Sequence, residues 1–150
     1  SAHWHGGTRV QVGHDNGTQV ATDMPGEFGG GGAEVSPGWL FRAGLAACAS
    51  TSIVMDASLQ GIPLTLLDVK VQSWSDARGM LGMLAADGQP VHAGPGEVRM
   101  TVRIAAEGVS AKRLRALVQG ALSHSPIPSA LRTATPLGLE IETNEAAETG

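Results

Sequence analysis

The chain has 150 residues, of which 42% are hydrophobic and 16% are charged, and its formal net charge is −4. A chain of this length can bury a core of its own, so we expect one domain spanning residues 1–150. The acidic balance and the scattered Lys and Arg residues argue against binding to nucleic acid or to an anionic membrane. The longest uncharged apolar stretch, residues 43–55, is shorter than the roughly 20 residues that a membrane span needs.

The N-terminal region has the pattern of a β-hairpin followed by a loop. Residues 8–12 and 18–22 are rich in β-branched side chains, and Asn16-Gly17 between them is a strong turn signal. Four consecutive glycines follow at residues 29–32. A phosphate-binding loop would need a following Gly-Lys-Ser/Thr sequence or a strand that leads straight into a Gly-x-Gly-x-x-Gly motif, and the sequence has neither. We therefore expect a flexible loop.

A long helix is predicted next. Ser36 is a favourable N-cap, Pro37 suits the first helical position, and Gly61 ends a helix that runs to about Gln60. Its interior is apolar or small on nearly every face, which is typical of a buried central helix with another helix packed closely against it. One further helix cannot cover so much apolar surface, so we expect a homodimer.

Two strands with period-two alternation are predicted in the second half, at residues 67–72 and 98–104. The connection between them, residues 75–96, is long and rich in Gly and Pro. We interpret it as an extended hairpin connection in which residues 80–84 continue a strand.

The C-terminal part has the pattern of a helix and a last strand. Ser110 caps an amphipathic helix that runs to about His124 and is ended by Pro126 and Pro128. Residues 137–141 alternate again and predict a strand. The order β-β-α-β-β-α-β indicates an α+β fold, with antiparallel strands around the long buried helix and the second, amphipathic helix.

Cys48, the single cysteine, excludes an intrachain disulfide and a Cys-rich metal site, and suits a reducing compartment such as the cytoplasm. We expect neither a metal nor a cofactor. Its own face of the helix is mainly apolar, which favours a buried core cysteine. A reactive thiolate would need a nearby cation, because the helix dipole acts only within the first turn. Arg42 projects from another side of the helix, so that cation must come from another element or another subunit.

Residues 36–48, SPGWLFRAGLAAC, resemble the start of the central helix in the OsmC/Ohr family, which reads roughly Pro-Glu-x-Leu-(Leu/Phe)-x-Ala-x-x-Ala-Cys. The Gly-rich loop, the element order and a second helix that ends in a Pro-containing turn are similar too. The resemblance covers residues 8–142. It implies an intertwined homodimer and a thiol peroxidase that acts on organic hydroperoxides or hydrogen peroxide in oxidative stress.

The resemblance also implies roles for single residues. Cys48 falls on the peroxidatic position, and Arg9 falls near the arginine that activates it. Gly38 stands where the family has a glutamate, and Ser125 stands where it has the second cysteine. Since serine cannot form a disulfide, turnover would need an external thiol as reductant. His124 adjoins that second position and is a candidate neighbour of Cys48.

A groove around Cys48 is the expected ligand site. Phe41, Leu45 and Met55 lie on the helical face that carries Cys48 and are candidates for its apolar lining. An alternative function follows from the same fold: a non-catalytic OsmC-like dimer that binds a small apolar ligand in this groove.

Overall fold

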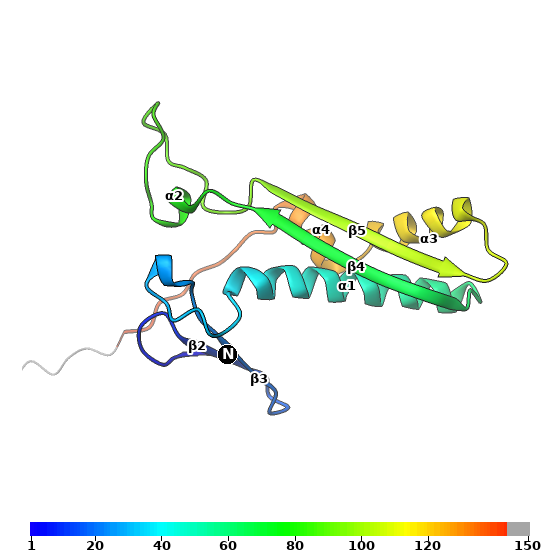
Figure 1. The fold of residues 1–150 in the computed structure, drawn as a ribbon, viewed down its shortest axis with the longest axis horizontal. Coiled ribbons are helices and arrows are strands. Elements are labelled where there is room, and N and C mark those ends of the chain that lie inside the picture. Colours follow the sequence, from blue (N-terminus) through cyan, green and yellow to red (C-terminus); the bar gives the residue numbers. More distant parts are fainter. Residues whose placement is uncertain (144–150) are drawn as a thin grey trace, which may run out of the picture.

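The computed structural model describes residues 1–143 and has an α+β architecture. Figure 1 shows a long helix that runs alongside a two-stranded sheet, with a small sheet near the N-terminal end of that helix. The strands are β1 (Ala2–Trp4), β2 (Val10–Gly13), β3 (Gln19–Thr22), β4 (Leu64–Trp74) and β5 (Glu97–Ala106). The helices are the 3-10 helix η1 (Gly26–Phe28), α1 (Pro37–Leu59), α2 (Ala77–Met80), α3 (Ala111–Ser123) and α4 (Pro126–Thr133).

The predicted N-terminal hairpin is confirmed as the antiparallel pair β2–β3. In its turn, Gly17 has a φ of 90°, and the Asn16 side chain accepts a hydrogen bond from the backbone N–H of Thr18. An additional strand, β1, pairs antiparallel with β2. This strand was not predicted, because its short, polar, His-rich sequence lacks a regular alternation.

Helix α1 begins and ends as its sequence predicts. The Ser36 hydroxyl accepts a hydrogen bond from the N–H of Trp39, Pro37 occupies the first turn, and Gly61 follows the C-cap with a φ of 63°. The expected burial on all sides is wrong for the single chain. The buried positions form one stripe, which consists of Leu45, Ala49, Ile53 and Ala57. Among the other apolar residues of α1, Trp39, Val54, Met55 and Leu59 are exposed in the single chain.

The buried stripe of α1 packs against β4, α3 and α4. By length and composition alone α1 would be able to cross a membrane, but in this structure it is the core helix of the chain. Ala57 packs with Ile62, Leu114 and Leu117 in a hydrophobic cluster between the end of α1 and α3. The amphipathic pattern predicted for α3 is therefore confirmed, since Leu114 and Leu117 lie on its buried face.

Strands β4 and β5 confirm the two alternating patterns and extend them at both ends. They pair antiparallel, with Val69 opposite Val102 on the half-buried face and Lys70 opposite Thr101 on the exposed face. Their long connection differs from its prediction. Residues 80–84 do not continue a strand: Met80 is the last residue of α2, residues 81–84 follow it, and an isolated bridge joins Leu84 to Pro90. Here Asp76 caps α2 by accepting a hydrogen bond from the N–H of Arg78, which turns the chain away from the sheet.

In the C-terminal part, α3 ends at Ser123, before Pro126, as predicted. A further helix that was not predicted, α4, begins at Pro126, and the predicted last strand is absent. Proline is tolerated in the first turn, where N–H groups have no helical partner. Residues 137–141 form no strand but an extended segment, in which Leu137, Leu139 and Ile141 are 95%, 84% and 74% exposed. A strand needs a hydrogen-bonded neighbour, and residues 1–143 provide none for this segment.

Candidate functional site

Cys48 lies midway along α1, at the junction of α1 with the start of α4. Its thiol is half-buried and unpaired with any other cysteine. The Cys48 Sγ lies 3.3 Å from the Oγ of Ser125, although the two residues are 77 positions apart in the chain. Ser125 is the N-cap residue of α4 and is 0% exposed. The predicted neighbourhood of Cys48 and Ser125 is therefore present in the single chain.

A second hydroxyl completes this cluster. Ser52 lies one turn after Cys48 on α1, and its Oγ is 2.9 Å from the Oγ of Ser125. The same Ser52 hydroxyl lies 3.0 Å from the carbonyl oxygen of Cys48, which the Ser125 hydroxyl approaches to 3.5 Å. The thiol thus contacts the hydroxyl of Ser125, and that hydroxyl in turn lies within reach of the Ser52 hydroxyl and the Cys48 carbonyl.

His124 is not bonded to Cys48, although the sequence made it a candidate neighbour. Its Nε2 lies 3.3 Å from a carboxylate oxygen of Asp56, one further turn along α1. Cys48, Ser52 and Asp56 are spaced four residues apart, so they share one face of α1. The His124–Asp56 contact lies next to Ser125 in the chain and holds the α3–α4 junction against that face.

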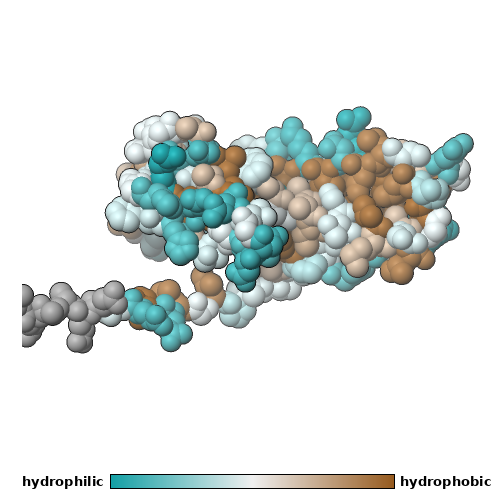
Figure 2. Space-filling model, turned by 90° about the horizontal axis from the view of Figure 1, so that it is seen from below, coloured by the Kyte–Doolittle hydropathy of each residue, from teal (hydrophilic) through white to brown (hydrophobic). Residues whose placement is uncertain are grey.

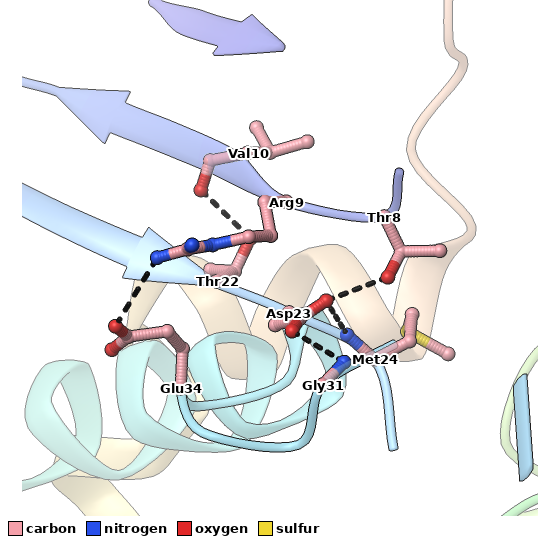
Figure 3. A network of polar contacts seen from close by, with 8 residues as sticks. All are labelled: Thr8, Arg9, Val10, Thr22, Asp23, Met24, Gly31 and Glu34. Carbon is pink, nitrogen blue, oxygen red and sulfur yellow. Dashed lines mark hydrogen bonds and ion pairs between the residues drawn. The ribbon is translucent and has the colours of Figure 1, made fainter. Parts of the chain in front are cut away.

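The two arginines considered as activators lie elsewhere in the single chain. The Arg9 guanidinium lies 3.9 Å from the Glu34 carboxylate, and both side chains are well exposed (Figure 3). Arg42 donates a hydrogen bond to the Ser73 hydroxyl of β4, at 3.2 Å. Within residues 1–143, no hydrogen bond or ion pair joins either arginine to Cys48. A cation for the thiolate is not supplied by the described part of one chain.

Asp23 is the centre of a polar network that the sequence analysis missed (Figure 3). Its carboxylate accepts hydrogen bonds from the Thr8 hydroxyl at 2.6 Å and from the N–H groups of Met24 and Gly31 at 2.8 Å each. These bonds, the Thr8 bond first, and the charge of Arg9 hold the pKa of Asp23 below its usual value against the opposing effect of burial. The Gly-rich segment, expected to be a flexible loop, is therefore attached to β3 and to the segment before β2.

The residue type and position of Asp23 indicate that its side chain accepts backbone hydrogen bonds. Aspartate often accepts hydrogen bonds from nearby backbone N–H groups where a chain leaves a strand, as Asp23 does directly after β3. Its partners Thr8 and Gly31 are distant in sequence, and no local pattern identifies them.

The three residues expected to line a groove beside Cys48 have different surroundings. Leu45 belongs to the buried stripe of α1, Phe41 is half-buried, and Met55 is 59% exposed. Figure 2 shows apolar side chains gathered on the side of the molecule that α1 forms. Val54, Met55 and Leu59 are exposed apolar residues of that helix.

Comparison with known proteins identifies the family. The OsmC-like protein family matches residues 29–140, which is most of the chain. The chain belongs to the OsmC-like family. The resemblance found in residues 36–48 is thereby confirmed at the level of the family. A search of curated proteins gives no significant match.

Solved structures of OsmC-like proteins share this fold. The organic hydroperoxide resistance protein OsmC from Legionella pneumophila is 26% identical, with a TM-score of 0.64 over 89% of this chain and 88% of that one. The OsmC-like protein from Mycoplasma pneumoniae is 17% identical, with a TM-score of 0.72 over 89% and 85%. An organic hydroperoxide resistance protein from Elizabethkingia anophelis is 22% identical, with a TM-score of 0.63 over 88% and 86%. The last two comparisons concern the fold alone.

Proposed function

We propose that this OsmC-like protein is a single-cysteine thiol peroxidase that reduces organic hydroperoxides with an external thiol. The observation that carries the proposal is the 3.3 Å contact between Cys48 Sγ and Ser125 Oγ. It places a potential nucleophile beside the position where the family resemblance expects a second cysteine. The match to an organic hydroperoxide resistance protein at 26% identity supports the substrate class.

The proposed reaction needs one thiol of the protein and two of the reductant. The Cys48 thiolate attacks the outer oxygen of the hydroperoxide, the O–O bond breaks, and the alkoxide takes a proton from water to leave as an alcohol. Cys48 is then a sulfenic acid. One external thiol displaces its oxygen as water and forms a mixed disulfide, and a second external thiol releases Cys48 and leaves as a disulfide.

The proposal includes a homodimer in a reducing compartment such as the cytoplasm. The exposed apolar residues of α1 and the unpaired segment 137–141 are surfaces that a second copy of the chain would cover. Arg9 of the second copy is the proposed activating cation, since Arg9 of the same chain pairs with Glu34. Met55 and Phe41 are the proposed contacts for the organic part of the peroxide. A free thiol without a protein partner thiol suits a compartment that supplies reducing thiols.

The first experiment measures consumption of cumene hydroperoxide by the purified protein with dithiothreitol as the reductant. We expect sustained consumption by the wild type and none above background by Cys48→Ala. Without dithiothreitol, intact mass should show one added oxygen at Cys48 and no linked sulfur. Wild-type consumption equal to that of Cys48→Ala would contradict the proposed function.

The Ser125→Cys variant tests the geometry of the site. Since the two positions are in contact, peroxide should link Cys48 to Cys introduced at this position by an intrachain disulfide, detected by peptide mapping under non-reducing conditions. Ser123→Cys is the matched control, because Ser123 is exposed and its hydroxyl donates to the carbonyl of Gly120 in the same helix. Oxidation of Cys48 without a disulfide in Ser125→Cys would contradict the proposed approach of the two side chains.

A non-catalytic, ligand-binding function is the second candidate, and one cavity favours it. A cavity of about 460 Å³ lies between the η1 segment, the start of α1 and α2. Met24, Phe28, Pro37 and Met80 contribute apolar surface to it. Saturable binding of an apolar fluorescent probe that Met80→Lys abolishes, together with an unreactive Cys48, would favour this function over the peroxidase.

A further inference from the structure

The two hydroxyls beside Cys48 have a geometry that suits a thiolate as well as a thiol. A serine hydroxyl donates one hydrogen bond, accepts up to two, and rotates to suit its partners. Ser125 Oγ lies within reach of the Cys48 Sγ at 3.3 Å and of the Ser52 Oγ at 2.9 Å. Ser125 is fully buried, so water cannot replace these partners.

Two arrangements of the protons satisfy this cluster without moving a heavy atom. With a neutral thiol, the Cys48 S–H donates to Ser125 Oγ, and the Ser52 hydroxyl donates to the Cys48 carbonyl oxygen at 3.0 Å. With a thiolate, Ser52 donates to Ser125 instead, and the Ser125 hydroxyl donates to the sulfur. The Cys48 carbonyl keeps its helical hydrogen bond in both cases.

We propose that Ser125 donates a hydrogen bond to the Cys48 thiolate during the attack on the peroxide, and that Ser52 positions it for this role. The inference rests on the proposed peroxidase function. It assigns a catalytic role to Ser125, which stands where the family has its second cysteine. Ser125 contacts the reacting sulfur and is a catalytic residue in this scheme, whereas Ser52 acts through Ser125.

Ser125 and Ser52 provide a stabilising contact for the Cys48 thiolate, which no cation in the described part of the chain provides. Neither Arg9 nor Arg42 is bonded to the sulfur, and the dipole of α1 is ineffective so far from the first turn. A hydrogen bond to a charged group stabilises that form more than a bond between neutral groups does. The thiolate is consumed in the step: its sulfur gains oxygen, and the peroxide is reduced to an alcohol.

The chain offers a matched control for Ser52. Ser50 lies on the same helix and makes the same kind of bond, from its hydroxyl to the carbonyl of Ala46 at 2.9 Å. Ser50→Ala and Ser52→Ala therefore remove equivalent bonds to the helix backbone. Only Ser52→Ala also removes a partner of Ser125. Ser52→Thr keeps the hydroxyl and is the conservative variant for rescue.

The experiment measures two rates for Cys48 by intact mass: oxidation by tert-butyl hydroperoxide and alkylation by iodoacetamide. Ser125→Ala and Ser52→Ala should lower both rates by roughly tenfold, which is the effect of losing one charge-assisted hydrogen bond. Ser50→Ala and Ser52→Thr should stay within about twofold of the wild type. Circular dichroism should show the same helix content in all four variants.

The outcomes separate this inference from the proposed function. If peroxide oxidises the wild type and Ser125→Ala equally fast, the inference is overturned and the peroxidase proposal stands. An equal slowing by Ser50→Ala and Ser52→Ala also overturns it, because that effect would come from the helix backbone. If peroxide leaves wild-type Cys48 unchanged while alkylation keeps the expected ranking, the peroxidase proposal fails and the hydrogen bond to the thiolate is supported.

Discussion

Asp23 shows how one side chain can hold several segments of a small protein. Its carboxylate accepts hydrogen bonds from Thr8 before β2, and from Met24 and Gly31 on either side of η1. Hydrogen bonds to an ionised carboxylate are stronger than those between neutral groups. They also stabilise the charged form, which lowers the pKa of Asp23 in the folded state.

The lowered pKa of Asp23 predicts a pH dependence of stability. A carboxyl group with a depressed pKa in the folded state contributes stability above its unfolded pKa, about 4, and loses it as the pH falls through the folded pKa. Asp23→Asn should therefore be less stable than the wild type in urea unfolding at pH 7. The difference should shrink below about pH 4. Asp15→Asn, in the exposed β2–β3 turn, is the control, and a pH-independent difference for Asp23→Asn would contradict the argument.

At the scale of elements, the Gly-rich segment has a glycine that its neighbours require. A Cβ atom on Gly30 would overlap the carbonyl group of Met24, which lies on the other side of η1. The backbone of this segment approaches so closely that a side chain cannot fit at Gly30. Gly26, the first residue of η1, has no atom near the position of a Cβ.

Gly30→Ala and Gly26→Ala form a matched pair for this close approach. We expect Gly30→Ala to lower the free energy of unfolding by about 2 kcal/mol or more, since the backbone must shift to make room. Gly26→Ala should change it by less than about 0.5 kcal/mol. Urea denaturation measures both values. Equal, small effects would mean that the segment adjusts freely and that the Asp23 hydrogen bonds do not hold it in place.

At the scale of the whole molecule, apolar surface remains uncovered on α1 and on the C-terminal segment. Val54 and Leu59 are 50% and 86% exposed, and Leu137, Leu139 and Ile141 have no neighbouring strand within residues 1–143. Figure 2 shows apolar side chains gathered on the side of the molecule that α1 forms. Contiguous apolar patches on a small protein commonly mark interaction surfaces, and a second copy of the chain is the proposed partner.

A charge in this surface should weaken the proposed dimer and spare the fold. Leu59→Lys should raise the dissociation constant of the dimer at least tenfold, because burying a leucine contributes about 1.5–3 kcal/mol. Its unfolding free energy, normalised for dimer dissociation, should change little, since Leu59 is exposed in the single chain. Sedimentation equilibrium measures the dissociation constant. Gln72→Lys, on the exposed face of β4, is the control, and a monomeric wild type at micromolar concentration would refute the dimer.

Local signals in the sequence were sufficient for the elements that carry their own stop and start residues or a clear period. Ser36, Pro37 and Gly61 determine the ends of α1 through capping and backbone preference, whatever packs around it. The period-two patterns of β4 and β5 likewise predict a half-buried pair of strands. The alternating pattern of residues 137–141 was not sufficient to predict a strand. Such a pattern becomes a strand only if another strand supplies hydrogen bonds. The same limit applies to α4, since Pro126 ends one helix or begins another depending on where the chain turns.

The sequence by itself determined that Cys48 lies in the middle of a long helix, and its resemblance to OsmC-like proteins indicated Ser125 as a neighbour. Only the tertiary structure showed that Ser52 joins them, that His124 turns to Asp56, and that Arg9 pairs with Glu34. Periodicity along one element cannot specify which side chains meet across two of them. Those contacts depend on how α4 packs against α1, and that packing follows from the burial of apolar surface over the whole chain.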